Sequence, residues 1–255
     1  MIRALLAFLL VLLPAASMAD ALPKLVPDVS QRDISIQSSF TGAELLLFGA
    51  IIYPRGVTPE GQIDVAVVLR GPTRPITVRE KKKIAGIWIN AASTDFQSVP
   101  SYYAIASSRP LNKIVDAKTA AIYELGLDKL QLSPNGEIEN LEQRRFASGL
   151  VDLNKRKGLY GQEAGAVIIT DSVLYRARLT IPSSVPVGRY VAETLLIKDG
   201  RVIVADDKVE VTIGKSGFER FVALLAEKHG LIYGAIAVMI SVFFGWFAGF
   251  IFNRL

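Results

Sequence analysis

The side chains that could do chemistry in this chain are few, and their types restrict what that chemistry could be. The 255 residues include no cysteine and a single histidine, His229. Disulfides, thiolate zinc sites and cysteine nucleophiles are therefore excluded, as are metal sites built from several histidines. A Ser-His-Asp triad would have to use His229, which directly precedes a long apolar segment and would place the triad on a bilayer surface. We expect His229 to be a linker residue.

Carboxylates remain as acid–base or metal-binding groups. Asp206 and Asp207 are adjacent, and because neighbouring strand residues point to opposite faces they are a poor joint ligand; an exposed turn is expected. Asp152, Glu163 and Asp171 show no mutual spacing that suggests a site. The sequence also lacks the Walker A, Gly-x-Gly-x-x-Gly, Gly-x-Ser-x-Gly and His-Glu-x-x-His patterns. We predict no catalytic, cofactor-binding or metal-binding residues, and hence a protein that is not an enzyme.

Basic side chains form the second group with chemical potential. The candidates for contacts with anions or lipid headgroups are Lys81, Lys82, Lys83, Lys155, Arg156 and Lys157. A lysine or arginine near an anionic membrane surface contributes about 1 kcal/mol to binding. The alternative is that these runs are solvated turns and helix ends. Few aromatic residues are interleaved with them, so nucleic acid is not expected as a partner.

The C-terminal segment has the composition of a membrane span. Leu231 to Phe252 is 22 residues without a charge, about 33 Å as a helix. Tyr233 lies near one end, and Trp246 and Phe252 lie toward the other, where aromatic side chains meet the membrane interfaces. We predict a transmembrane helix over 230–252 and a cytoplasmic tail over 253–255.

Small residues recur along this predicted span. Their spacing places most of them within an arc of about 80° on a helix, and the members are Gly230, Gly234, Ala237, Ser241, Gly245, Ala248 and Gly249. Small side chains let helix backbones approach closely in lipid. The stripe predicts self-association or contact with another membrane protein, the alternative being that glycine and alanine are simply common in spans.

The N-terminus has the parts of a secretory signal. Arg3 is followed by an apolar run of about ten residues, and Ser17-Met18-Ala19 is a small-x-small exit. We predict that 1–19 is a signal peptide that is cleaved, the run being too short to span a bilayer. Export would place 20–230 outside, although Lys215, Arg220 and Lys228 then flank the exported side against the positive-inside rule. Long segments translocate largely regardless of charge, so the signal decides the topology.

Residues 20–214 carry the pattern of a mainly β domain. Short β-branched and aromatic runs alternate from Ile34 to Ser107 and resume from Ala166 to Ile213, without the repeat of a βαβ unit. Gly188-x-Tyr190 follows a proline-rich bend, as in the tyrosine corner of immunoglobulin-like sandwiches. We predict an immunoglobulin-like β-sandwich, with Trp88 in its core.

Two further helical patterns interrupt and follow these strands. Apolar spacing between Pro110 and Gly158 predicts a helical hairpin inserted at about 110–158, with one helix from Pro110 to Gly126 and a second from Glu137 to Lys157. After the last strand, 215–229 predicts an amphipathic juxtamembrane helix. That helix either lies on the membrane surface or is a lead-in that continues into the span.

Several motifs together resemble one family. They are Thr41-Gly-Ala, Leu47-Phe-Gly-Ala50, Gly158-Leu-Tyr160, Tyr175 to Pro182, Val185 to Tyr190, Lys215 to Arg220, Ile232-Tyr-Gly-Ala and Gly245-Trp246. The set is similar to a transmembrane protein family of alphaproteobacteria and covers nearly the whole mature chain. The resemblance implies a single-pass protein of the bacterial inner membrane with its main domain in the periplasm, and supplies no catalytic residues. It also ranks a small-anion exporter first among membrane partners.

Three functions remain open on these observations. The preferred hypothesis is a non-enzymatic periplasmic domain, tethered by one span in the lipid bilayer, that acts as an accessory or interaction subunit of a membrane complex. The second is a periplasmic module that binds a ligand or an envelope polymer, with the helical insert as a lid. The third is a carboxylate-based hydrolase, which needs two carboxylates about 5–10 Å apart in one cleft.

Overall fold

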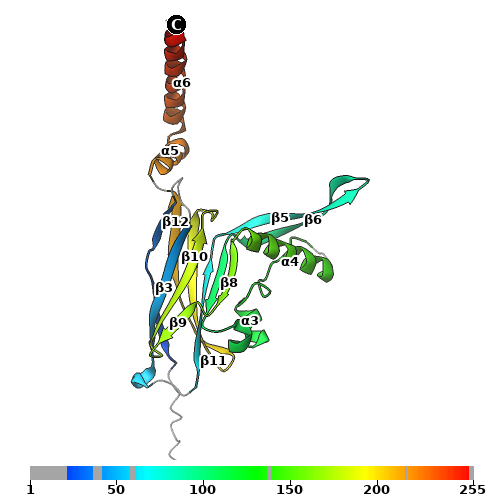
Figure 1. The fold of residues 1–255 in the computed structure, drawn as a ribbon, viewed down its shortest axis with the longest axis vertical. Helices are drawn as coiled ribbons and strands as arrows, with labels where there is room; N and C mark the ends of the chain where they lie inside the picture. The colour runs from blue at the N-terminus through cyan, green and yellow to red at the C-terminus, as the bar shows by residue number, and fades with distance from the viewer. Residues whose placement is uncertain (1–21, 37–41, 58–60, 137–138, 216, 253–255) are drawn as a thin grey trace, which may run out of the picture.

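The structure is a computed structural model in which residues 22–36, 42–57, 61–136, 139–215 and 217–252 are described (Figure 1). About 50% of the chain is strand and 27% is helix, so the predicted mainly β class with one C-terminal apolar helix is confirmed. The predicted signal segment 1–19 and the tail 253–255 lie outside the described residues.

Two sheets face each other in the main body. One has the order β1-β3-β10-β9 and the other the order β2-β12-β11-β4-β7-β8. The strands of the first sheet are β1 (Lys24–Val29), β3 (Gly42–Ile52), β9 (Val167–Thr170) and β10 (Leu174–Pro182). Those of the second are β2 (Asp33–Ile36), β4 (Ile63–Arg70), β7 (Tyr103–Ser107), β8 (Tyr160–Ala164), β11 (Gly188–Lys198) and β12 (Arg201–Lys215).

The chain crosses from one sheet to the other several times, for example between β3 and β4 and between β10 and β11. Neighbouring strands are antiparallel except β2 with β12 and β7 with β8, which run parallel. A short 3₁₀ turn, η1 (Pro54–Gly56), follows β3.

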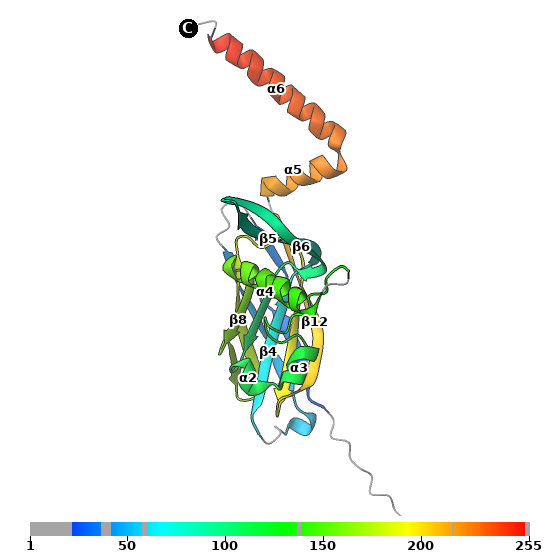
Figure 2. The ribbon, with the colours of Figure 1, turned by 90° about the vertical axis from the view of Figure 1, so that its right-hand side faces the viewer.

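The second sheet is covered on both faces, which explains the apolar run in β4. Every residue from Asp64 to Leu69 is buried. One face packs against the first sheet, and insert residues such as Leu111, Ile114 and Leu125 belong to the same core. The body is therefore three layers thick where the insert lies (Figure 2).

A long hairpin, the arm, leaves the sandwich between β4 and β7. It consists of β5 (Thr73–Ile84) and β6 (Ile87–Pro100), which form a separate two-stranded sheet (Figure 1). The prediction that Trp88 is a sandwich core residue is wrong, since Trp88 lies near the tip of this arm with 65% of its surface exposed. At about 3.3 Å per residue the arm carries it far beyond the sandwich edge.

The insert occupies the predicted region, but its first half is not one helix. The chain forms α2 (Leu111–Ile114) and α3 (Ala117–Ile122), then an irregular segment, then α4 (Asn140–Arg156). Asp116 starts α3 as its N-cap, accepting a hydrogen bond from the Thr119 N–H at 2.6 Å. The helical hairpin predicted for 110–158 is thus two short helices and one long one, and α4 packs on β8 and the arm.

Two helices follow the last strand. α5 (Gly217–Lys228) and α6 (Gly230–Phe252) are separated at His229, and the chain turns between them (Figure 2). From Gly230 to Gly249, α6 is long and apolar enough to span a membrane, with a mean hydropathy of 2.1 and no part of it buried in the protein. In both views the arm tip lies at the end of the body from which α5 and α6 extend (Figures 1 and 2).

Candidate functional site

The carboxylates considered for catalysis belong to different elements of the fold. Asp152 is on α4, Glu163 on β8, and Asp171 in the turn between β9 and β10. The prediction that Asp206 and Asp207 form a turn is wrong. Both residues lie inside β12, at a point where its pairing with β11 shifts register. Within the described residues no group of three or more His, Cys, Asp or Glu side chains could hold a metal ion.

The basic candidates divide between two elements. Lys81, Lys82 and Lys83 lie on the outer half of β5, and all three are exposed. Lys155 and Arg156 end α4, and Lys157 is its C-cap. Arg156 pairs with Asp152 one turn earlier, so part of that second group is already neutralised.

The arm tip combines these lysines with apolar side chains. Lys83 is opposite Trp88, Lys82 is opposite Ile89, and Ile84 is opposite Ile87 in the antiparallel register. Since opposite residues share a face and successive residues alternate, each face of the tip carries lysine beside an apolar side chain. Ala85 and Gly86 close the hairpin with φ of 50° and 87°, as in a type I′ turn.

Helix α4 braces the inner half of the arm. A small core separate from that of the sandwich is formed by Val78, Phe96, Val99, Leu132, Phe146 and Leu150. Arg145 adds an ion pair to Glu80, 3.1 Å long. The arm therefore packs against α4 as far as Glu80, and its side chains beyond Glu80 are exposed to solvent.

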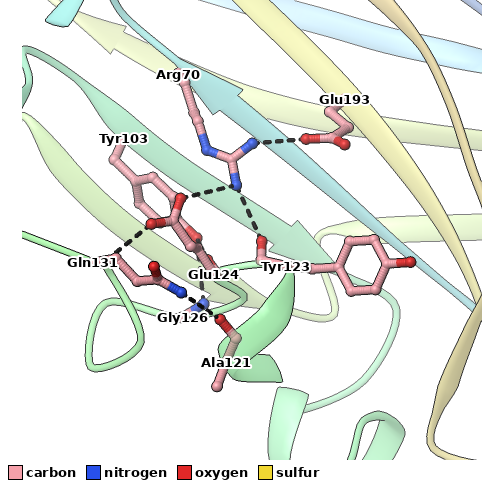
Figure 3. Close-up of polar contacts among 8 residues, drawn as sticks. All are labelled: Arg70, Tyr103, Ala121, Tyr123, Glu124, Gly126, Gln131 and Glu193. Carbon is pink, nitrogen blue, oxygen red and sulfur yellow. Dashed lines mark hydrogen bonds and ion pairs between the residues drawn. The ribbon is translucent and has the colours of Figure 1, made fainter. Parts of the chain in front are cut away.

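A charged junction joins the insert to the second sheet (Figure 3). Arg70, at the end of β4, donates a 2.7 Å hydrogen bond to Glu193 on β11 and a 3.1 Å bond to the carbonyl of Tyr123. Its guanidinium also lies 3.8 Å from Glu124 and 5.9 Å from the ring centre of Tyr103. A hollow of about 340 Å³ opens beside these groups.

The loop after α3 is held by the same junction. The Tyr103 hydroxyl donates to the carbonyl of Glu124 at 2.6 Å and accepts from the Gly126 N–H at 3.2 Å. Glu124 has a φ of 52°, and its Oε1 accepts from the Gln131 N–H at 3.0 Å. Burial raises the pKa of Tyr103 to about 12, so its hydroxyl stays protonated and keeps donating at neutral pH. The two junction carboxylates are thus engaged in holding the loop.

A second ion pair closes the other end of β4. Asp64 is buried and receives two hydrogen bonds from Arg109, at 2.9 and 2.5 Å, and one from Ser108 at 2.7 Å. Burial opposes its charge, but these bonds and the Arg109 charge outweigh burial and lower the pKa of Asp64. The pair fixes the start of the insert against the sheet.

The bend before β11 has the contacts of a tyrosine corner. The Tyr190 hydroxyl donates to the carbonyl of Pro186, four residues earlier, at 2.6 Å. Gly188 has a φ of 149°, and a Cβ there would lie 2.8 Å from Pro72 Cγ. The sandwich corner of Gly188 and Tyr190 is therefore a structural feature.

The small residues of α6 face open space. A Cβ built on Gly230, Gly234, Gly245 or Gly249 would meet nothing within 4 Å. The Ser241 hydroxyl donates a 2.9 Å hydrogen bond to the carbonyl of Ala237 within the helix, so it does not project from this face. Aromatic side chains occupy another part of the helix, where the Phe243 and Phe247 rings stack at 6.0 Å.

A groove of about 870 Å³ runs between α4 and the segment before it. Its charged residues are Asp128, Arg144, Asp152 and Lys155. A smaller hollow of about 520 Å³ lies between α2, α3 and β8.

Sequence reasoning missed the exposed tip and the Arg70 junction. The Ala-Gly pair between two β-rich runs was the available sign of a hairpin. For the junction there was no local sign, since Arg70 and Glu193 are 123 residues apart.

One comparison with known proteins gives a match. The model of a family described as "Putative transmembrane protein (Alph_Pro_TM)" matches residues 24–254. Neither a curated protein nor a solved structure matches the chain.

Proposed function

Because the chain belongs to this alphaproteobacterial family of transmembrane proteins, we propose that it is a non-enzymatic accessory subunit of a membrane complex. In this proposal α6 crosses the bacterial inner membrane once, and the sandwich stands in the periplasm. One observation carries it: β12 ends at Lys215 and α6 begins at Gly230, so a strand of the sandwich is joined to the span through residues 216–229, which include α5.

The turn at His229 supports a surface position for α5. A straight lead-in would continue the axis of α6, whereas the two helices are set at an angle (Figure 2). Phe221 and Leu224 of α5 are exposed, as expected of an apolar side that lies in the headgroup region. This arrangement favours the interfacial helix over the lead-in.

The partner in this proposal is another inner-membrane protein, a small-anion exporter being the first candidate, or a second copy of the chain. It contacts the small-residue stripe of α6, where the open glycines allow close backbone approach.

Purification in mild detergent tests this role. We expect a defined membrane protein, or a crosslinked dimer, to accompany the wild-type chain and to be lost from Gly245→Leu. Ala235→Leu, which adds similar bulk outside the stripe, is the matched control and should retain the partner. Equal recovery from both variants would contradict the proposal, and so would a sandwich that protease reaches only from the cytoplasmic side.

A second function is favoured by the groove beside α4. A periplasmic binding module would use this volume for an anionic ligand or envelope polymer, with Arg144 and Lys155 at its edge. Titration of the full chain in detergent with anionic cell-envelope fragments tests it. Binding that Arg144→Gln and Lys155→Gln abolish would support this function in place of the accessory role.

A further inference from the structure

We propose that the tip of the β5–β6 arm inserts into the surface of an anionic phospholipid bilayer, forming a second membrane contact beside α6. The inference rests on the proposed function only in that α6 spans a membrane next to the sandwich. It assigns a role to residues 81–89, which the sandwich fold does not use.

The exposed apolar surface of the tip is unusual for a surface hairpin. Ile84, Ile87, Trp88 and Ile89 are 54%, 67%, 65% and 44% exposed, and they surround a two-residue turn, with the isoleucines on one face of the hairpin and Trp88 on the other. Exposed apolar side chains gathered at one point of a surface are typical of an interaction site. Tryptophan is also the side chain most suited to a bilayer interface, because its ring is apolar and its N–H can bond to water or headgroups.

The charges beyond Glu80 at this apolar tip are of one sign. Lys81, Lys82 and Lys83 adjoin it, and no acidic residue occurs between Glu80 and Asp95. Glu80 pairs with Arg145 of α4 at 3.1 Å and with Lys82 at 3.9 Å. Three lysines beside an exposed apolar tip complement anionic headgroups above acyl chains, whereas a neutral protein groove would give Lys81 and Lys83 no counter-charge.

The position and support of the arm fit this role. Its tip lies at the α5 end of the body in both views (Figures 1 and 2). Phe146 and Leu150 of α4 hold its inner half against Val78 and Phe96. Because α4 already holds the arm in place, the arm loses little conformational entropy when it binds a membrane, and binding is stronger than for a flexible hairpin.

Trp88 itself can report on the contact in the full chain. The protein has two tryptophans, so Trp246→Phe leaves Trp88 as the single tryptophan, which can be excited apart from the tyrosines. This variant is reconstituted at a low protein-to-lipid ratio in vesicles of phosphatidylcholine with phosphatidylglycerol, and in phosphatidylcholine alone. We expect blue-shifted Trp88 emission and quenching by bromine placed high on the acyl chains, both stronger in the anionic vesicles.

Variants in the same background separate charge from apolar contact. Lys81, Lys82 and Lys83 changed together to Gln should lower the ratio of bound to free arm on the order of 100-fold, since each near-surface lysine contributes about a fivefold factor. Ile87→Ser with Ile89→Ser should lower it at least about tenfold. The matched control changes Lys155, Arg156 and Lys157 to Gln, which removes the same charge from α4 and should leave Trp88 emission unchanged.

Distinct results would overturn the proposal. If an aqueous quencher still reduces Trp88 emission and brominated lipid does not, the tip does not contact the bilayer. A shift that grows with the protein-to-lipid ratio without lipid quenching would assign the tip to a second copy. Either result leaves the accessory role untouched, because that role is read from partner recovery through α6.

Discussion

The guanidinium of Arg145, on α4, lies 3.1 Å from the carboxylate of Glu80, on β5. This ion pair marks a boundary along the arm. On its inner side the arm shares a small core with α4, and on its outer side β5 continues into three exposed lysines and the turn. The arm is thus a supported element with an unsupported tip, and the support can be tested separately from the tip.

Phe146→Ala should release the inner half of the arm. Phe146 is 4% exposed in the core that α4 shares with the arm, and removing such a ring costs about 3 kcal/mol. Amide hydrogen exchange in β5 and β6 should accelerate while that in β4 and β11 stays slow. Leu141→Ala, at a 75% exposed position on the same helix, is the control. Acceleration throughout the sandwich would show that the two cores are not separable.

Arg70→Met should loosen the insert. The change keeps most of the apolar length but leaves Glu193 and Glu124 without their shared cation, at a cost of about 2 kcal/mol. Denaturant unfolding in detergent measures it, and adding Glu193→Gln should recover part of the loss. Arg178→Met breaks an exposed pair with Glu44 and should cost less than about 1 kcal/mol. Equal losses for Arg70→Met and Arg178→Met would contradict a structural role for the junction.

How much the sequence could predict depended on the range of the interactions. The β texture, the long apolar helix and the bend at Gly188 and Tyr190 are local patterns, and these were visible. The position of Trp88 on the arm could not be predicted from the sequence. Ile-Trp-Ile has the same alternation of side chains in a sandwich strand as in a free hairpin. Only the packing of neighbouring strands decides between them.

The candidate site was predictable to a smaller extent. The sequence identified the lysines of the arm as headgroup candidates, but nothing in it placed Ile84 and Ile87 beside them at an exposed turn. It also predicted one helix where Asp116 caps a new one. The junction of Arg70 with Glu193 and Glu124 needed the fold, because it joins two sheet strands to a loop.

Ala85→Asn should stabilise the arm. Ala85 has a φ of 50°, a left-handed conformation that costs an ordinary residue about 1–2 kcal/mol and that asparagine tolerates better. Asn-Gly is also the preferred pair of a type I′ turn, so a gain of up to about 1 kcal/mol is expected. Slower amide exchange at the outer ends of β5 and β6 would show it. Ala91→Asn, on β6 outside the turn, should bring no gain, and faster exchange in Ala85→Asn would refute the turn assignment.

Acidification should weaken the sandwich through Asp64. Its pKa is lowered below the ordinary value of 3.8 because, against the cost of burial, Arg109 and Ser108 bond its charged form. A carboxyl with a lowered pKa stabilises the fold above its unfolded-state pKa, and that contribution is lost as pH falls through the folded value. Stability should therefore hold at neutral pH and decline below about pH 4.

Asp64→Asn isolates this contribution. The variant keeps the shape of the side chain but loses its charge, so at pH 7 it should be less stable by about 1–2 kcal/mol. A larger loss is not expected, because Arg109 is partly exposed and solvent screens the ion pair. The difference from the wild type should shrink as pH falls below 4, when the wild-type carboxyl also becomes neutral. Denaturant unfolding in detergent at pH 7 and at pH 3 measures both. Asp28→Asn, in an exposed pair with Arg32, is the control with a smaller effect. A difference that is independent of pH would mean that Asp64 acts by its shape and not by its charge.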